Sequence, residues 1–249
     1  MKNISSETAG NKLIFALDTD SYKEALSWVE LLSGHVGMFK VGKELFTSVG
    51  PKIIEGIKRR GGRVFLDLKF HDIPHTVARA AEVATKMGVD MFNIHASGGS
   101  KMIKEAISAA WICADKLGKA KPVILAVTVL TSLDNDDLAE IGYEKSVNEL
   151  VILLAKAAHT AGASGVVASA QDIAALRTNF GNKFIIVTPG IRSADGATKD
   201  DQKRTMSAFE ALKTGADYIV VGRPIRDAKE PLEACRQFVR EIAAGLAAR

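Results

Sequence analysis

The chain has 249 residues, of which 47% are apolar and 25% are charged, and its formal net charge is +4. These fractions are typical of a globular protein and exclude a disordered chain, a collagen and a disulfide-stapled scaffold. Its two cysteines, Cys113 and Cys235, lie far apart with no CxxC motif, which argues against a structural zinc site and favours a reducing cytoplasmic compartment. The first ten residues lack the apolar core of a secretory signal, and no apolar run reaches the ~18 residues of a membrane span, so we expect no membrane partner.

Short apolar, β-branched runs alternate with longer helical patterns from one end of the chain to the other. The runs are almost continuously apolar, as expected for parallel strands that are covered on both faces. In chain order, strands are predicted at residues 13–18, 37–41, 63–68, 90–95, 122–129, 163–168, 183–187 and 216–221, with clear helical patterns at 77–87, 101–117, 147–161 and 231–246.

Eight strand–helix units of about 30 residues each predict a parallel sheet, and their number favours a closed barrel. No GxGxxG motif follows the first strand, which argues against an open dinucleotide-binding sheet. Because no linker divides the chain, we predict a single (β/α)8 TIM barrel over residues 1–249, with residues 1–12 as an N-terminal tail. Two long polar segments, 131–144 and 188–205, are predicted to be functional loops, the second of them a lid.

Charged side chains fall at neighbouring strand ends, where barrel enzymes carry their chemistry. Strand periodicity places Asp67 and Lys69 on one face of the third strand. Asp72 follows in the next turn, and Lys40 lies near the end of the adjacent strand. These positions predict an alternating array of positive and negative charge. A structural ion-pair network is the alternative interpretation, but the placement at the barrel mouth favours a functional one.

Such an array suits chemistry in which a negative charge leaves the substrate. Two carboxylates that face a substrate anion raise its energy and favour steps that remove or spread its charge. A lysine between carboxylates stays cationic and can donate a proton, whereas an imine-forming lysine must become neutral. We therefore predict that Lys69 is a proton donor, with Asp67, Asp72 and Lys40 completing the catalytic array.

A phosphate site is predicted on the other side of the barrel mouth. Gly222 and Arg223 follow the eighth strand, where barrels commonly bind phosphate, and Pro189, Arg192 and Gln202 could fold over the same group. A metal site is disfavoured because Lys40 and Lys69 put positive charge where a cation would sit. The histidines His35, His71, His75, His95 and His159 are given no catalytic role.

Several of these motifs together resemble one known family. The run FLDLKFHDIPHT at residues 65–76 is similar to the DxKxxDIPxT signature of the orotidine 5′-phosphate decarboxylase family. Further matches occur in the same order as in the family, from about residue 13 to the end of the chain. They are FALD at 15–18, KVG at 40–42, VTVLTS at 127–132, TPGIR at 188–192, DQ at 201–202 and VGR at 221–223.

The resemblance implies decarboxylation of orotidine 5′-monophosphate to UMP, the last step of de novo pyrimidine nucleotide synthesis, with no metal or organic cofactor. It implies that Asp67 faces the C6 carboxylate and that Lys69 protonates C6 after carbon dioxide leaves. Asp72 and Thr76 would reach the neighbouring subunit's substrate, which implies a homodimer with shared sites. The implied substrate-binding residues are Asp18 and Lys40 at the ribose, Thr131 and Ser132 at the pyrimidine, and Arg192, Gln202, Gly222 and Arg223 at the phosphate.

Three alternatives remain open at this stage. A sister enzyme of the same superfamily, such as a keto-gulonate-phosphate decarboxylase or hexulose-phosphate synthase, would share Asp67, Lys69 and Asp72 but use Mg²⁺ with an acidic residue in place of Lys40. A non-catalytic phosphate-binding barrel would bind UMP without releasing carbon dioxide. Nucleic-acid binding is disfavoured because lysines are interspersed with acids along the whole chain.

Overall fold

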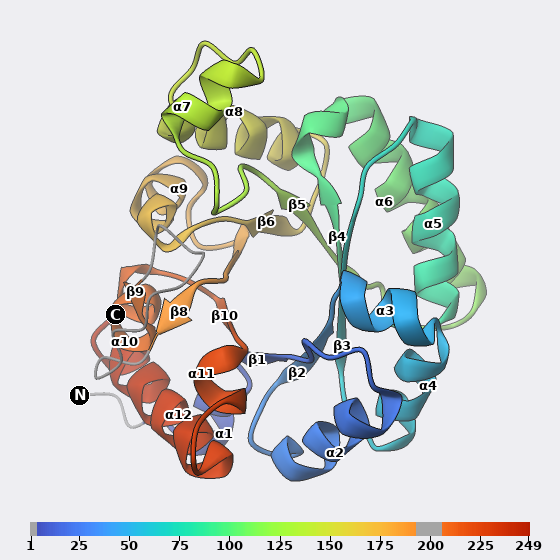
Figure 1. Ribbon diagram of the computed structural model, residues 1–249. Helices are drawn as coiled ribbons and strands as arrows, with labels where there is room; N and C mark the ends of the chain where they lie inside the picture. Colours follow the sequence, from blue (N-terminus) through green and yellow to red (C-terminus); the bar gives the residue numbers. More distant parts are fainter. Residues whose placement is uncertain (1–3, 193–205) are drawn as a thin grey trace.

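Eight parallel strands close into a barrel that helices surround (Figure 1). The structure is a computed structural model and describes residues 4–192 and 206–249. Each strand pairs with its neighbours in the order β1-β10-β7-β6-β5-β4-β3-β2. The barrel strands are β1 Leu13–Ala16, β2 Met38–Val41, β3 Val64–Phe70, β4 Met91–His95, β5 Val123–Val127, β6 Gly165–Val167, β7 Ile185–Thr188 and β10 Tyr218–Val221.

Helices follow most of the strands and cover the outside of the barrel (Figure 1). Two short 3-10 turns, Ala96–Gly98 and Ala170–Asp172, lead into α6 and α9. The helices are α1 Ser6–Gly10, α2 Tyr22–Leu32, α3 Lys43–Val49, α4 Lys52–Arg59, α5 Pro74–Lys86, α6 Gly99–Lys116, α7 Asn135–Glu140, α8 Val147–Thr160, α9 Ile173–Phe180, α10 Ala208–Thr214, α11 Arg223–Arg226 and α12 Pro231–Ala247.

The predicted (β/α)8 barrel is confirmed, and each predicted strand overlaps an observed one. Three local features differ from the prediction. Residues 131–144 are not loop throughout, because helix α7 forms there behind a capping box in which Asp134 and Asp137 cap each other's backbone. The predicted tail contains helix α1, which packs against α12 and buries Ala9 completely. A two-stranded sheet, β8 Ile191–Arg192 with β9 Met206–Ser207, flanks the segment predicted as a lid. Residues 193–205 of that segment, Gln202 among them, lie outside the described residues.

The two-residue period of the strands decides which side chains face the barrel interior. An apolar layer fills the middle of the barrel and includes Ile14, Met38, Phe65, Met91, Leu125, Val187 and Val220. The alternate side chains pack outward against the helices in the main core. Two residues beyond Met38, Phe65 and Met91 come Lys40, Asp67 and Asn93. The same periodicity that builds the apolar layer therefore brings three polar side chains to the C-terminal mouth.

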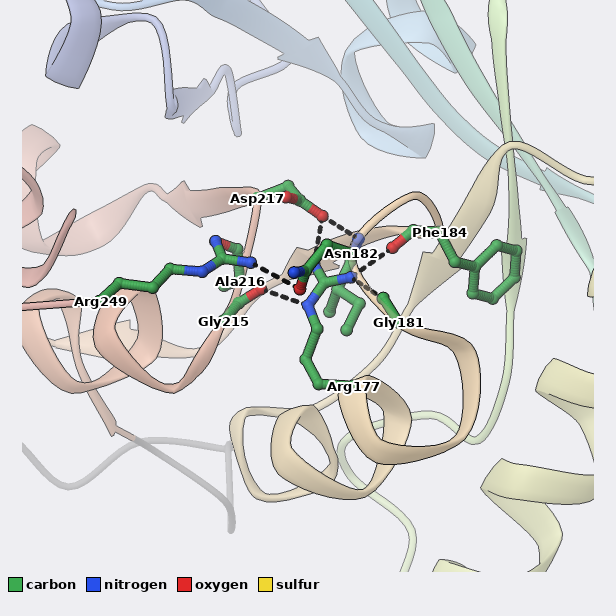
Figure 2. A network of polar contacts seen from close by, with 9 residues as sticks. Arg177, Gly181, Asn182, Phe184, Gly215, Ala216, Asp217 and Arg249 are labelled. Carbon is green, nitrogen blue, oxygen red and sulfur yellow. Dashed lines mark hydrogen bonds and ion pairs between the residues drawn. The ribbon is translucent and has the colours of Figure 1, made fainter.

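The opposite end of the barrel is held by an arginine network (Figure 2). Arg177 of α9 forms an ion pair with Asp217, and Asp217 also accepts the backbone N–H of Ile186 at 2.8 Å. The Arg177 guanidinium donates to the backbone oxygens of Gly215, Gly181 and Phe184 at 2.8, 2.9 and 2.6 Å. These contacts join the segments that enter β7 and β10, so we assign this network to stability.

None of the helices in the described residues has the length and apolar content that crossing a membrane requires.

Candidate active site

A chain of alternating charges crosses the barrel mouth from β1 to β3. Lys40 Nζ lies 3.0 Å from Asp18 Oδ1 and 3.7 Å from Asp67 Oδ2. The other carboxylate oxygen of Asp67, Oδ1, lies 2.5 Å from Lys69 Nζ. The order within one chain is therefore Asp18, Lys40, Asp67 and Lys69. Side chains from three adjacent strand ends meet here because barrel closure places β1, β2 and β3 side by side.

The sequence predicted Asp72 as the last member of this array, and within one chain that expectation is wrong. Asp72 is exposed, and its Oδ1 accepts the backbone N–H of Ile73 at 2.6 Å. Asp18 is the first member of the array. The two-residue period of a single strand could not predict its contact with Lys40, because that contact depends on the pairing of β1 with β2.

Asn93 on β4 is a site residue that the sequence analysis did not assign. Its amide nitrogen donates to Asp67 Oδ1 at 2.7 Å, and its amide oxygen accepts the backbone N–H of Lys69 at 2.8 Å. The side chain is completely buried. A polar residue on an otherwise apolar buried strand, two residues after Met91, was the signal that could have identified it.

Asp67 remains a carboxylate although only 14% of its side chain is exposed. Burial raises its pKa, but the charges of Lys40 and Lys69, together with hydrogen bonds from Lys69 and Asn93, outweigh burial and bring the pKa below its usual value. The site therefore holds a largely buried negative charge at neutral pH, fixed by hydrogen bonds from Lys69 and Asn93 and by the charge of Lys40.

A cavity of about 240 Å³ opens above the charge array and extends to the ends of β7 and β10. Its lining unites most of the predicted site residues, namely Asp18, Lys40, Asp67, Lys69, Thr131, Pro189, Arg192, Gly222 and Arg223. Three other predicted residues are exposed and lie outside this lining: Asp72, Thr76 and Ser132.

The far side of the cavity is positively charged. Burial and the nearby charge of Arg223 lower the pKa of Arg192, so the two guanidinium groups raise each other's energy. An anion bound beside them relieves this repulsion. A Cβ at Gly222 would lie 3.1 Å from Asp18 Oδ2 and 3.2 Å from Ala16 Cβ, so a larger residue in the wall between the arginines and the charge array would press against Asp18.

His95, at the end of β4, is neutral at physiological pH. Burial, His71 and Lys69 lower its pKa to about 4. The two imidazole rings lie 5.2 Å apart between centroids. No group of three or more His, Cys, Asp or Glu side chains converges as a metal site would within the described part of the chain.

The fold and the site define a class: a (β/α)8-barrel enzyme whose mouth sets a lysine–carboxylate array opposite a pair of arginines. The chain belongs to the "Orotidine 5'-phosphate decarboxylase / HUMPS family", whose model matches residues 11–238. Among its relatives, the orotidine 5′-phosphate decarboxylase of Syntrophus aciditrophicus is 53% identical over 249 residues, covering 100% of this chain and 99% of that protein.

Further relatives agree with that assignment. The orotidine 5′-phosphate decarboxylase of Trichlorobacter lovleyi is 50% identical, covering 96% of this chain and 98% of that protein. The crystal structure of orotidine 5′-phosphate decarboxylase from Lactobacillus acidophilus matches with a TM-score of 0.82 at 38% identity, covering 92% of this chain and 98% of that one.

Proposed function

We propose that this chain decarboxylates orotidine 5′-monophosphate to UMP at the cavity above the charge array. The family and the full-length relatives that carry this name support the reaction. The observation that carries the assignment of the site is the order Asp18, Lys40, Asp67 and Lys69 along one wall, with Arg192 and Arg223 in the lining of the same cavity.

Asp67 and Lys69 are proposed to carry the chemical step. The C6 carboxylate of the substrate binds beside the largely buried Asp67 carboxylate, and their repulsion disappears when the carboxylate leaves as neutral carbon dioxide. The C6–carboxylate bond breaks with its electron pair left on C6, beside the Lys69 ammonium group. Lys69 Nζ then transfers its proton to C6, giving UMP and a neutral amine that takes a new proton from solvent.

The contacts of the array are made between groups of the protein itself, so they are preorganised in the sense that electrostatic catalysis requires. Lys40 lies between Asp18 and Asp67, and its charge helps to lower the pKa of Asp67, while Asn93 and Lys69 fix the Asp67 oxygen that they share. No part of this wall has to reorganise when charge develops on C6.

Binding energy is proposed to come from the distant phosphate. Arg192 on β8 and Arg223 on α11 line the cavity. Helix α11 begins at Arg223, directly after Gly222. Contacts with a group that does not react can hold the substrate carboxylate against Asp67. We assign Pro189 and Gly222 to the walls of the phosphate subsite, Thr131 to the pyrimidine side, and Asp18 with Lys40 to the ribose hydroxyls.

We propose that two copies of the chain share their sites. The exposed segment 71–76 presents Asp72 and Thr76 beside Ile73, whose side chain is 66% exposed. An apolar residue at this exposure, next to polar residues that do not reach their own cavity, fits a contact with a second copy.

Complementation tests the shared site. Lys69→Ala and Asp72→Ala should each be nearly inactive alone, but mixed dimers contain one site with both residues intact. An equal mixture that is dissociated and reassociated should recover about one quarter of the wild-type rate, because half of the dimers are mixed and one site in each is intact. A mixture that stays as inactive as the two variants, although mixed dimers have formed, argues against sharing.

Two buried thiols, Cys113 and Cys235, are consistent with a cytoplasmic location, which we propose on that ground. Burial raises the pKa of Cys235 to about 11, so this thiol is unreactive at neutral pH.

A magnesium-dependent sugar-phosphate enzyme of the same superfamily is the competing assignment, because such an enzyme would share Asp67, Lys69 and Asp72 with this chain. Lys40 argues against it: its ammonium group lies between Asp18 and Asp67, where a divalent cation would otherwise use their oxygens. The test is the fall in ultraviolet absorbance of orotidine 5′-monophosphate, with EDTA and with added Mg²⁺. We expect equal rates in the two conditions; a reaction that needs Mg²⁺, or one that acts only on a hexulose or gulonate phosphate, overturns the assignment.

A further inference from the structure

We propose that Asn93 is a positioning residue that builds the reactive geometry of Asp67 and Lys69 by replacing a missing part of the β3–β4 hydrogen-bond ladder. This inference rests on the proposed roles of Asp67 and Lys69. The Asn93 side chain contacts Asp67 and Lys69, and it is proposed to act on the reaction only through these two residues.

The pairing of β3 with β4 is irregular at this point. Leu66 is paired with Phe92, and the next paired residues are Phe70 and Ile94. Three residues of β3, from Asp67 to Lys69, therefore face the single residue Asn93 on β4. A regular parallel ladder would place one residue opposite one, so β3 carries a bulge of two extra residues, and the backbone of the bulge lacks its ordinary partners.

Lys69 occupies the strained position of this bulge. Its φ is 54°, and it is the only non-glycine residue with a positive φ among those that the structure describes. A residue with a Cβ is strained in this left-handed region and persists there only where its surroundings enforce it. The Asn93 amide oxygen accepts the Lys69 backbone N–H at 2.8 Å, which supplies the partner that the ladder does not.

The other end of the same amide fixes the Asp67 carboxylate. Asn93 Nδ2 donates to Asp67 Oδ1 at 2.7 Å, and this oxygen also receives Lys69 Nζ at 2.5 Å. Lys40 lies on the side of the second oxygen, at 3.7 Å. An amide turned the other way would set an oxygen against the carboxylate and an NH2 group against an N–H, so only the observed orientation satisfies both partners.

The residue type follows from this double contact. An aspartate could accept the Lys69 N–H but would place a second negative charge against Asp67, and an alanine or leucine would satisfy neither partner. Because Asn93 is completely buried, water does not compete for either hydrogen bond or replace a lost one.

Burial raises the pKa of Asp67, while the charges of Lys40 from β2 and Lys69 from its own strand and the hydrogen bonds of Lys69 and Asn93 lower it. Asp18, which follows β1, is the charged group on the other side of Lys40. The Asn93 donor is one of the causes that lower the pKa of Asp67. Its loss should therefore raise that pKa and move the acid limb of the kcat profile to higher pH, a change that a purely structural role of Asn93 does not produce.

The experiment compares Asn93→Ala and Asn93→Asp with the wild type and with Thr128→Val as the matched control. Thr128 is also buried at a strand end, its hydroxyl donates to the Val167 oxygen at 3.2 Å, and it lies outside the cavity lining. The measurements are kcat and KM for orotidine 5′-monophosphate, the pH profile of kcat, the Kd of UMP, and a crystal structure of each Asn93 variant.

We expect kcat of Asn93→Ala to fall by about 10²- to 10³-fold, the usual loss when one preorganised donor is removed. The Kd of UMP should change by less than about threefold, because UMP carries no carboxylate against Asp67. The acid limb should shift upward, and the crystal structure should show Lys69 with a negative φ and Nζ withdrawn from Asp67. Asn93→Asp keeps the acceptor for the Lys69 N–H and should lose kcat as strongly, while Thr128→Val should retain it.

Several results would overturn the inference. They are a kcat of Asn93→Ala within about threefold of the wild type, an unshifted acid limb, or a left-handed Lys69 still paired with Asp67 in the variant structure. If Asn93→Ala does not fold, Asn93→Asp decides: full activity overturns the role of the amide donor. If the proposed reaction itself is wrong, the outcome is different: the wild type does not act on orotidine 5′-monophosphate. The crystal structures of the variants still show whether Asn93 holds the bulge.

Discussion

Replacing Lys69 by alanine removes the proposed proton donor, and the structure sets the scale of the loss. Lys69 Nζ lies 2.5 Å from Asp67 Oδ1, so C6 of a substrate whose carboxylate contacts Asp67 is within a few ångströms of the ammonium group. Two unit charges about 4 Å apart attract by about 4 kcal/mol at an effective dielectric constant of about 20, which corresponds to about 10³ in rate. Loss of general-acid catalysis contributes a further factor of about 10² to 10⁴.

We therefore expect kcat of Lys69→Ala to fall by about five orders of magnitude or more, with the Kd of UMP nearly unchanged. The left-handed backbone cost stays the same, because alanine also carries a Cβ. The assay is the loss of substrate absorbance at saturating substrate, with UMP binding measured by calorimetry. Lys23→Ala on α2, an exposed lysine away from the cavity, is the matched control and should match the wild type. A kcat of Lys69→Ala within about tenfold of the wild type would refute the proton-donor role.

The remaining predictions concern the phosphate side, acid stability and the base of the barrel. Arg223→Ala should lower kcat/KM by about 10²-fold or more and weaken UMP binding. The control Arg236→Ala, at an exposed position, should change neither quantity. Equal kcat/KM for the two variants would exclude a contact between Arg223 and the substrate phosphate. The pKa of Asp67 is lowered by folding, so its carboxylate stabilises the fold above the unfolded value of about 4, and this stabilisation is lost as the pH falls through the lower folded value. In urea unfolding the wild type should therefore lose stability more steeply below about pH 4 than Asp67→Asn does, and parallel curves would contradict the lowered pKa. Arg177→Ala should reduce the free energy of unfolding by about 3–5 kcal/mol, because Asp217 loses its ion-pair partner. At a temperature where the variant stays folded, its kcat should remain within about twofold of the wild-type value. A large loss of kcat would show that this network also serves the active site.

The barrel was predictable because its signals are repeated. Eight nearly continuous apolar runs, separated by helical patterns, indicate parallel strands whether or not their exact ends are known, and small shifts such as β1 ending at Ala16 rather than residue 18 do not change the topology. Asp67 and Lys69 were found because their spacing places them at one strand end, and the family signature around them is long.

Features that depend on one local interaction were missed. Helix α7 is short and polar, and its signal was the Asp134 and Asp137 capping pair rather than an apolar stripe. The bulge in β3 is invisible to a two-residue period, and with it the role of Asn93, because the sequence does not reveal that three residues face one.

The positions of the charge array were predicted with one member, Asp72, that does not reach the others within the chain. The sequence distance between Lys69 and Asp72 suggested contact within the chain, but the turn at 71–73 carries Asp72 into solvent, while closure of the barrel brings Asp18 to Lys40. Proximity along the chain was a weaker guide than adjacency of strands in the closed sheet.

The most direct test of the central claim is the product formed from orotidine 5′-monophosphate in D2O by the metal-free protein. If Lys69 delivers a solvent-exchanged proton to C6 after carbon dioxide leaves, NMR should show UMP with deuterium at C6 and one equivalent of carbon dioxide released. Lys69→Ala should form almost none of this product. An unchanged substrate with wild-type protein, or UMP formed equally fast by Lys69→Ala, would contradict the account.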